Sequence, residues 1–233
     1  MTMAIDTAGL HVKGLTVDYG NGAGLWDFDL DVAPGEVVCV IGKNGAGKSS
    51  ALLGISGFVK PQSGSVVVDG RLLAGTPYRR CKKHIGLVVK GRSLFGSLTL
   101  AENLALAHID ERDFFDLFPQ LADRRDVPAG SLSGGQQQLA AVGRALLRDV
   151  RVVLLDELTF GLSPAVRTLI ARVVGEQARD RGISVVVVEQ HVETAVAIAD
   201  RTLVLADGRT ALELSRDELV DATEHVEHTY LHP

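Results

Sequence analysis

Short apolar runs, separated by polar and glycine-rich stretches, dominate the hydrophobic pattern of the chain. Residues 37–41, 152–155 and 183–188 are rich in Val, Ile and Leu, and turn-forming or charged residues bound each run. Strands buried on both faces of a parallel sheet have this continuous apolar character. Each run is far shorter than the roughly 18 residues that a membrane-spanning helix needs. We therefore predict that these runs are strands of a central parallel sheet.

Alternating apolar and polar positions predict a second kind of sheet. Residues 10–33 alternate in this way, which is typical of half-buried antiparallel strands. Residues 63–70 and 201–214 predict two more strand pairs, the second turning at Asp207–Gly208, and residues 84–89 predict a single strand. The N-terminal region is therefore expected to contain an antiparallel β subdomain.

Helical patterns dominate the middle of the chain. Thr99 and Glu102 form a capping box, which predicts a helix that continues through His108. Residues 110–118 predict a further helix. Because residues 97–147 show no strand pattern, we predict that they form a helical insert.

Strand–helix alternation resumes after Asp149. Ser163 and Pro164 favour a helix start, with Ser as the cap and Pro at the first helical position, and another helix is predicted from about Val192. The chain is accordingly expected to have three parts: residues 1–96, with the β subdomain and the first part of the core; 97–147, the helical insert; and 148–233, with the rest of the core and the C-terminal strands and helix.

Composition narrows the class of protein. The 233 residues are 46% hydrophobic and 23% charged, which excludes a disordered or fibrous chain. The net charge of −5 argues against nucleic acid or anionic lipid as the main partner, so no nucleic-acid partner is expected. Cys39 and Cys81 form no CxxC pattern, and residues 1–9 show no secretory signal. A reduced, cytosolic protein is the simplest interpretation.

A glycine-rich loop follows the first apolar run and fits the pattern G-x-x-x-x-G-K-[ST]. Glycines let backbone N–H groups close around phosphate oxygens, and a following helix adds its positive dipole. Lys48 is expected to reach the β- and γ-phosphates of a nucleotide, and Ser49 to ligate Mg²⁺. The alternative is a tight strand–helix turn without a ligand. The predicted nucleotide-binding residues of this loop are Gly42, Lys43, Asn44, Gly45, Ala46, Gly47, Lys48, Ser49 and Ser50.

Two carboxylates end the apolar run at 152–155. Asp156 and Glu157 are expected at the carboxyl edge of the parallel sheet, where such sheets bind their ligands. Asp156 is predicted to hold Mg²⁺, and Glu157 to orient or deprotonate an attacking water. The alternative is a solvated acidic strand end.

A second anion site is predicted where Ser133 and two glycines precede a helical run. From average residue usage, a chance match to this five-residue pattern is rarer than about one in a thousand. Phosphate-loop kinases and GTPases share the first motif but not this one. Its residues are Leu132, Ser133, Gly134, Gly135 and Gln136.

The phosphate loop, LSGGQ and LLDE, in this order, resemble the ATP-binding subunit of ABC transporters over nearly the whole chain. The resemblance implies an α/β fold: a P-loop NTPase (RecA-like) parallel-sheet core with an N-terminal antiparallel β subdomain and a helical insert. It also implies that ATP and Mg²⁺ are held between two subunits, each phosphate loop facing the partner's LSGGQ. The expected partner is thus a second ATP-binding subunit, in a homodimer or a heterodimer.

The same resemblance assigns further residues. Tyr19 matches the aromatic residue that stacks on adenine, with a buried strand tyrosine as the alternative. Residues 161–164 match the loop that touches the partner subunit. The expected catalytic residues are Glu157, Gln190 and Lys48.

Sequence segments around these motifs indicate one branch of the family. The segments FGSLTLAENLALA, SLSGGQQQLAAVGRALL and VVEQHVETAVAIADR are similar to the second ATPase subunit of branched-chain amino-acid uptake systems, although related branches carry urea or short amides. Import through membrane permease subunits is implied, on the inner face of the plasma membrane. The candidate permease contacts are Phe95–Leu98, Phe114, Phe115 and Phe118, although ordinary core packing is the favoured interpretation for any single Phe.

Two positions depart from the family pattern. Lys90 stands where the general family has a glutamine that contacts Mg²⁺; it is expected to approach the γ-phosphate or to point to solvent. Gln190 occupies the position of the switch histidine, and His191 lies one residue out of register, as a helix-start or surface residue unless the following helix is shifted. We therefore expect an asymmetric pair, in which this chain's own site is slow and its LSGGQ completes a faster site.

Two other functions remain open at this point. A weakly hydrolysing, ATP-gated regulatory subunit is favoured by Lys90 and opposed by the intact Glu157. A soluble ABC ATPase of DNA repair or translation would need long coiled coils or tandem ATPase halves, which a 233-residue chain of negative charge does not have.

Overall fold

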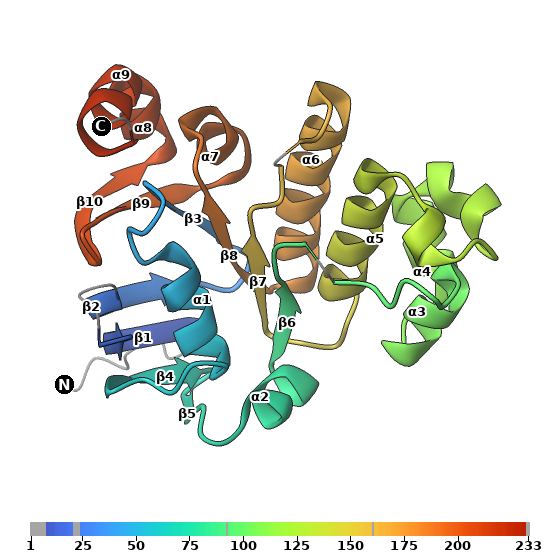
Figure 1. Cartoon of the computed structure of the whole chain (residues 1–233), viewed down its shortest axis with the longest axis horizontal. Coiled ribbons are helices and arrows are strands. Elements are labelled where there is room, and N and C mark those ends of the chain that lie inside the picture. Colours follow the sequence, from blue (N-terminus) through green and yellow to red (C-terminus); the bar gives the residue numbers. More distant parts are fainter. Residues whose placement is uncertain (1–7, 21–23, 92, 160, 232–233) are drawn as a thin grey trace.

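The computed structural model describes residues 8–20, 24–91, 93–159 and 161–231. The three predicted apolar runs lie side by side in a six-stranded sheet (Figure 1). Neighbouring strands are parallel, except that the edge strand β10 runs antiparallel to β9. The strand order is β10 (Arg209–Ser215), β9 (Arg201–Ala206), β3 (Val37–Gly42), β8 (Ser184–Glu189), β7 (Val152–Asp156) and β6 (Ile85–Val88).

A second, antiparallel sheet is built from the alternating segments, as predicted. Its order is β2 (Gly24–Val32), β1 (Leu10–Asp18), β4 (Ser63–Val68) and β5 (Arg71–Leu72). The apolar side chains of β1 and β2 are buried, and their polar neighbours face outward. The α/β class with an N-terminal antiparallel β region is therefore confirmed.

Helices cover both faces of the parallel sheet. Helix α1 (Lys48–Ser56) and the antiparallel sheet share one core with the inward side chains of Val38 and Val40 of β3. Helices α5 (Gly134–Leu146), α6 (Pro164–Arg181) and α7 (Val192–Ile198) share the other core, on the opposite face of the same strand. Figure 1 shows α1 and α5 on either side of β7 and β8.

The predicted helical insert contains α3 (Leu100–Leu106), α4 (Glu111–Leu117), short 3₁₀ turns at Pro119–Arg124 and Ala129–Ser131, and α5. The capping box of Thr99 and Glu102 is present. The expectation that α3 continues through His108 is wrong, because His108 adopts a left-handed backbone (φ 57°) that ends the helix.

Two of the candidate permease contacts belong to the core instead. Phe114 and Phe118 are fully buried, so ordinary core packing, the favoured interpretation of a single Phe, is confirmed for both, and neither is a permease contact. Both rings pack on Gly143, where an added Cβ would lie 2.7 Å from Phe114 and 2.6 Å from Phe118. Phe95, by contrast, is 58% exposed.

Helix α2 (Pro77–Lys83) was not predicted from the pattern. It has no buried residue, so it has no apolar face that a periodicity could reveal. After β10, where a C-terminal helix was expected, the chain forms three short helical pieces: α8 (Arg216–Asp221), α9 (Thr223–Val226) and a π-helical turn at Glu227–Leu231. None of the described helices is long and apolar enough to cross a lipid bilayer.

Candidate functional site

The phosphate loop joins the carboxyl end of β3 to the start of α1. Gly47 caps α1 in a left-handed conformation (φ 100°) and supplies no side-chain hydrogen bond to the first turn. A Cβ at Gly47 would come within 2.7 Å of the Gly24 carbonyl oxygen, so only glycine fits there. The N–H groups of this helix end therefore lack a capping side chain and are available to an anion.

Lys48 is folded back into its own loop. Its Nζ donates hydrogen bonds to the carbonyl oxygens of Gly42 (2.6 Å) and Lys43 (2.8 Å). Burial lowers the pKa of Lys48, against the opposing attraction of Glu157 and Asp156. An ammonium group buried inside the loop is suited to meet phosphate oxygens.

Ser49 and Asp156 come together from different elements. The Oγ of Ser49, on α1, lies 3.4 Å from the Oδ2 of Asp156, at the end of β7. Burial and the charge of Glu157 raise the pKa of Asp156. Its buried Oδ1 has no hydrogen-bond partner among the described residues. A hard cation here would satisfy this orphaned oxygen and offset the burial of the carboxylate, so the two side chains fit Mg²⁺.

Mg²⁺ at this position would depend on its substrate for further ligands. In the part of the chain that the structure describes, no group of three His, Cys, Asp or Glu side chains is arranged to hold a metal ion. Mg²⁺ is commonly bound through one or two carboxylates together with substrate phosphates and waters. The pair of Ser49 and Asp156 is compatible with that arrangement.

Glu157 is held by both residues that depart from the family pattern. Its Oε1 accepts a hydrogen bond from the Nε2 of Gln190 (2.5 Å), and its Oε2 forms an ion pair with the Nζ of Lys90. Burial favours a higher pKa for Glu157, but the hydrogen bonds from Lys90 and Gln190 outweigh it and hold the pKa below its ordinary value. Glu157 also has a left-handed backbone (φ 47°), a conformation that is uncommon outside glycine.

Strand register explains why Lys90 meets Glu157. In the parallel pair of β6 and β7, Val88 lies opposite Leu155. Lys90 and Glu157 each follow two residues later, so they leave the sheet at the same level. Lys90 therefore points to Glu157, although its side chain is 60% exposed.

His191 stays outside this cluster. It is exposed and caps α7, without a side-chain hydrogen bond to the helix. Gln190 is thus the residue of this pair that reaches Glu157. Helix α7 is not shifted so as to bring His191 into the site.

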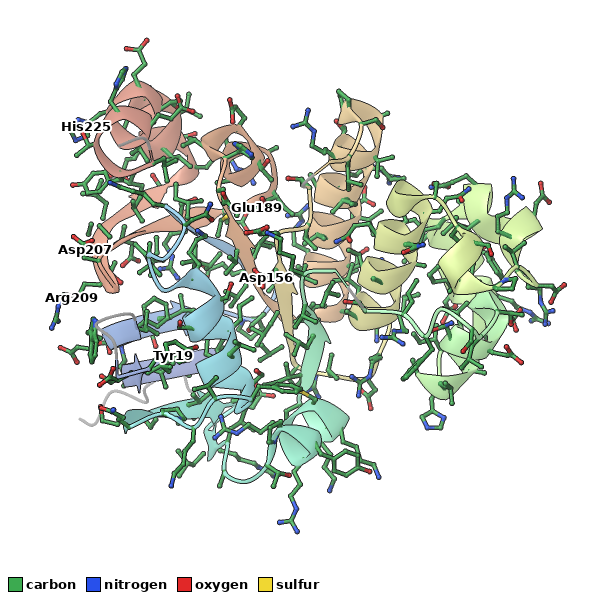
Figure 2. All side chains as sticks on the ribbon, in the orientation of Figure 1. Tyr19, Asp156, Glu189, Asp207, Arg209 and His225 are labelled. Atoms are coloured by element: carbon green, nitrogen blue, oxygen red, sulfur yellow. The ribbon has the colours of Figure 1, made fainter. Side chains whose placement is uncertain are left out.

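Tyr19 lies just beyond β1 and is 47% exposed, so it is not the buried strand tyrosine of the alternative interpretation. Its hydroxyl accepts a hydrogen bond from the Oγ of Ser50, on α1 (3.4 Å). Figure 2 shows Tyr19 beside this helix. The next residues, 21–23, lie outside the described part of the chain.

The LSGGQ segment starts α5. Ser133 is the cap: its Oγ accepts from the Gln136 N–H (3.3 Å), and Gln136 Oε1 accepts from the Ser133 N–H (3.0 Å). Gly134 and Gly135 form the first turn rather than a loop before the helix, and Leu132 is buried. Because α1 and α5 cover opposite faces of the sheet, the structure does not bring LSGGQ together with the phosphate loop of the same chain.

One buried acid was not singled out from the sequence. Glu189, the last residue of β8, is only 2% exposed and precedes Gln190. Its Oε1 accepts hydrogen bonds from the N–H (3.1 Å) and the Oγ1 (3.2 Å) of Thr159. The sequence signal that could have identified Glu189 is a carboxyl group at the end of an otherwise apolar predicted strand.

Fold and site together define a P-loop ATPase. The family model described as "ABC transporter" matches residues 25–160. The chain is 39% identical to the high-affinity branched-chain amino acid transport ATP-binding protein BraG of Pseudomonas aeruginosa, over 83% of this chain and 87% of that one. It is 34% identical to the thiamine import ATP-binding protein ThiQ of Salmonella paratyphi A, over 83% and 86%.

A solved structure described as MJ1267, an ATP-binding cassette of an ABC transporter, has the same fold. The TM-score is 0.82 at 23% identity, over 94% of this chain and 96% of that one. The chain therefore belongs to the ABC transporter family, and it is one of the family's ATP-binding, transport-coupled ATPases.

Proposed function

We propose that this chain is the motor subunit of an ABC importer for branched-chain amino acids or related small amides. The observation that carries the proposal is the meeting of four side chains at the carboxyl ends of β3 and β7: Lys48, Ser49, Asp156 and Glu157. They provide a buried cation, two oxygens suited to a metal ion and a carboxylate beside them. These are the groups that hydrolysis of ATP requires.

Each group has a distinct role in the reaction. Lys48 binds the β- and γ-phosphates, and Tyr19 stacks on adenine. Ser49 and Asp156 would hold Mg²⁺, and the bound ion would supply positive charge to the same phosphates. Glu157, oriented by Gln190, directs a water at the γ-phosphorus and takes up its proton, while the bond to the bridging oxygen of ADP breaks.

A second ATP-binding subunit is needed to complete this site. LSGGQ and the phosphate loop belong to helices on opposite faces of the sheet, so the signature of another chain would cover the γ-phosphate. We further propose that the pair is asymmetric. Lys90 on Glu157 slows this chain's own site, whereas the intact Ser133 cap completes the site of the partner.

The permease is proposed to dock beside the helical subdomain, residues 97–147, on the inner face of the plasma membrane. A groove there is lined by exposed aromatic and aliphatic side chains, among them Phe58, Tyr78, Phe95 and Leu106. The buried Asn103 fixes the segment that carries Phe95, because its amide bonds the N–H (2.9 Å) and the carbonyl oxygen (3.0 Å) of that residue.

The substrate class is the most specific part of the proposal. It is supported by the sequence segments shared with the branched-chain uptake systems and by the name of BraG, while ThiQ is a thiamine importer at lower identity. Uptake of labelled isoleucine and thiamine should be compared in cells that lack the chain and in cells that carry it. Restored uptake of isoleucine alone is expected; restored uptake of thiamine would contradict this assignment.

ATP binding tests the site itself. Lys48→Ala should weaken binding of ATP by the purified chain at least tenfold, because it removes the buried ammonium. Lys60→Ala, which changes an exposed lysine, is the matched control and should bind as wild type. Equal affinities of the Lys48→Ala chain and wild type would exclude this loop as the nucleotide site.

A weakly hydrolysing regulatory subunit is the second candidate, and the ion pair of Lys90 with Glu157 favours it. Lys90→Gln, with the exposed Lys83→Gln as control, separates the two functions. A motor subunit with a slowed site should hydrolyse ATP faster when the ion pair is removed. A weakly hydrolysing regulatory subunit should bind ATP and keep the same low turnover in both variants.

A further inference from the structure

The end of β8 contacts the segment after β7 at two successive residues. Gln190 bonds the side chain of Glu157, and Glu189 bonds the backbone and hydroxyl of Thr159. The same hydroxyl also lies 3.3 Å from the Oγ1 of Thr194, on α7. Figure 2 shows Asp156 and Glu189 at these neighbouring strand ends. The segment 157–159 is thus held from one strand at both of its ends.

The proposed reaction does not use Glu189 directly. Its side chain is almost completely buried, and its contacts are to Thr159 rather than to the phosphate loop. An apolar residue would be the ordinary choice for this strand, which is otherwise Ser184 followed by four valines. A buried carboxyl is unfavourable unless its hydrogen bonds serve a purpose.

We infer that Glu189 is a positioning residue: by holding Thr159 it fixes the segment that presents Glu157 and leads into the loop at 161–164. This inference rests on the proposed function, in which Glu157 directs water and that loop meets the second subunit. The strained backbone of Glu157 makes such support necessary, because a left-handed residue relaxes unless its neighbours are held. At Glu157 itself, the N–H donates to the carbonyl oxygen of Val188 (2.9 Å) and Gln190 holds the side chain, so Glu189 is the residue that fixes the other end of the segment, at Thr159.

The charge state of Glu189 is expected to change how firmly the segment is held. Burial raises the pKa of Glu189 to about 7, despite the hydrogen bonds from Thr159. The charged and titratable groups that act on it are Glu157 after β7, Lys48 on α1 and Cys39 on β3. Because burial outweighs the Thr159 hydrogen bonds, ionisation of Glu189 favours opening of the segment to water.

Hydrogen exchange of the nucleotide-free chain tests the inference without hydrolysis. In Glu189→Ala the Thr159 N–H should exchange at least tenfold faster than in wild type. Glu189→Gln keeps an oxygen acceptor and should restore most of the protection. Glu193→Gln, an exposed carboxyl on α7, is the matched control and should leave exchange unchanged. In wild type the protection should fall as the pH rises from 4.5 to 7, because an opening that exposes the carboxyl releases its proton, whereas Glu189→Gln should show no such step.

Steady-state phosphate release, by the chain or by its complex with a second subunit, tests the consequence. Glu189→Ala should lower kcat at least tenfold and change KM for ATP less than twofold, and Glu189→Gln should recover kcat. Unchanged Thr159 exchange, or a lower melting temperature with unchanged kcat, would overturn the positioning role. If wild type releases no phosphate, the proposed function is refuted. The hydrogen-exchange result then decides whether Glu189 holds Thr159. If Glu189→Ala does not fold, the pH step missing in Glu189→Gln remains the test.

Discussion

The buried carboxyl of Glu189 also predicts how stability depends on pH. Glu189→Gln removes an ionisable group whose pKa is raised from 4.5 to about 7 in the folded chain. At about 1.4 kcal/mol for each pH unit between these values, the ionised group lowers the free energy of unfolding by about 3 kcal/mol. Gln has a similar shape and carries no such penalty.

The sign follows from proton binding. Between pH 4.5 and 7 the folded chain keeps the Glu189 proton while the unfolded chain loses it, so this group makes the free energy of unfolding fall as pH rises. Below 4.5 both states are protonated, and above 7 neither is. Glu189→Gln should therefore gain about 3 kcal/mol relative to wild type between pH 4.5 and pH 8.

Chemical denaturation of the nucleotide-free chain measures this difference. Urea unfolding of wild type, Glu189→Gln and the exposed control Glu193→Gln should be compared at pH 5 and pH 8. The free-energy difference between Glu189→Gln and wild type should grow with pH, and that of Glu193→Gln should stay constant. An equal Glu189→Gln difference at both pH values would refute the reasoning.

Three further predictions concern packing and binding. Gly143→Ala should lower the free energy of unfolding by about 1–3 kcal/mol, because the new Cβ would lie 2.6 Å from the ring of Phe118; an unchanged urea midpoint would contradict this. Asn103→Ala should lower it by about 1–3 kcal/mol by leaving the buried polar groups around Phe95 unpaired, and unfolding that matches wild type would show that water replaces the amide. Tyr19→Ala should weaken ATP binding about tenfold in titration calorimetry while Tyr19→Phe retains it, and equal losses in both variants would point to the hydroxyl rather than stacking.

Much of the fold follows from local pattern. Continuous apolar runs, rich in Val with Ile or Leu, identify β3, β7 and β8, because a strand that is covered on both faces has no solvent-facing polar positions. The Thr99 capping box identifies the start of α3 in the same way, since its hydrogen bonds join residues three apart. Such signals lie within a few residues of one another and can be read without the tertiary structure.

The contacts between distant residues could not be predicted in this way. Lys90 and Glu157 meet only because β6 lies beside β7 in one particular register. Nothing near Lys90 in sequence indicates that partner, so solvent and the γ-phosphate were the expected surroundings. Likewise, the burial of Phe114 depends on the absence of a side chain at Gly143, which belongs to another helix.

The roles of the site residues remain predictions that the geometry makes testable. Lys48, Ser49 and Asp156 come together as expected, and Gln190 rather than His191 reaches Glu157. The sequence motif predicts which residues gather, because phosphate binding demands a fixed local pattern. The motif does not predict the ion pair that Glu157 forms with Lys90.

Phosphate release by the chain, alone and mixed with a second, different ATP-binding subunit, tests the central claim most directly. Ser133→Arg should be compared with the matched control Ser215→Arg, because both serines are exposed caps with a capping box and only the first belongs to LSGGQ. The account predicts that the mixture releases phosphate faster than the two chains separately, and that Ser133→Arg abolishes this gain while Ser215→Arg keeps it. Full turnover by the chain alone, or a mixture insensitive to Ser133→Arg, would contradict a motor built from two unlike subunits.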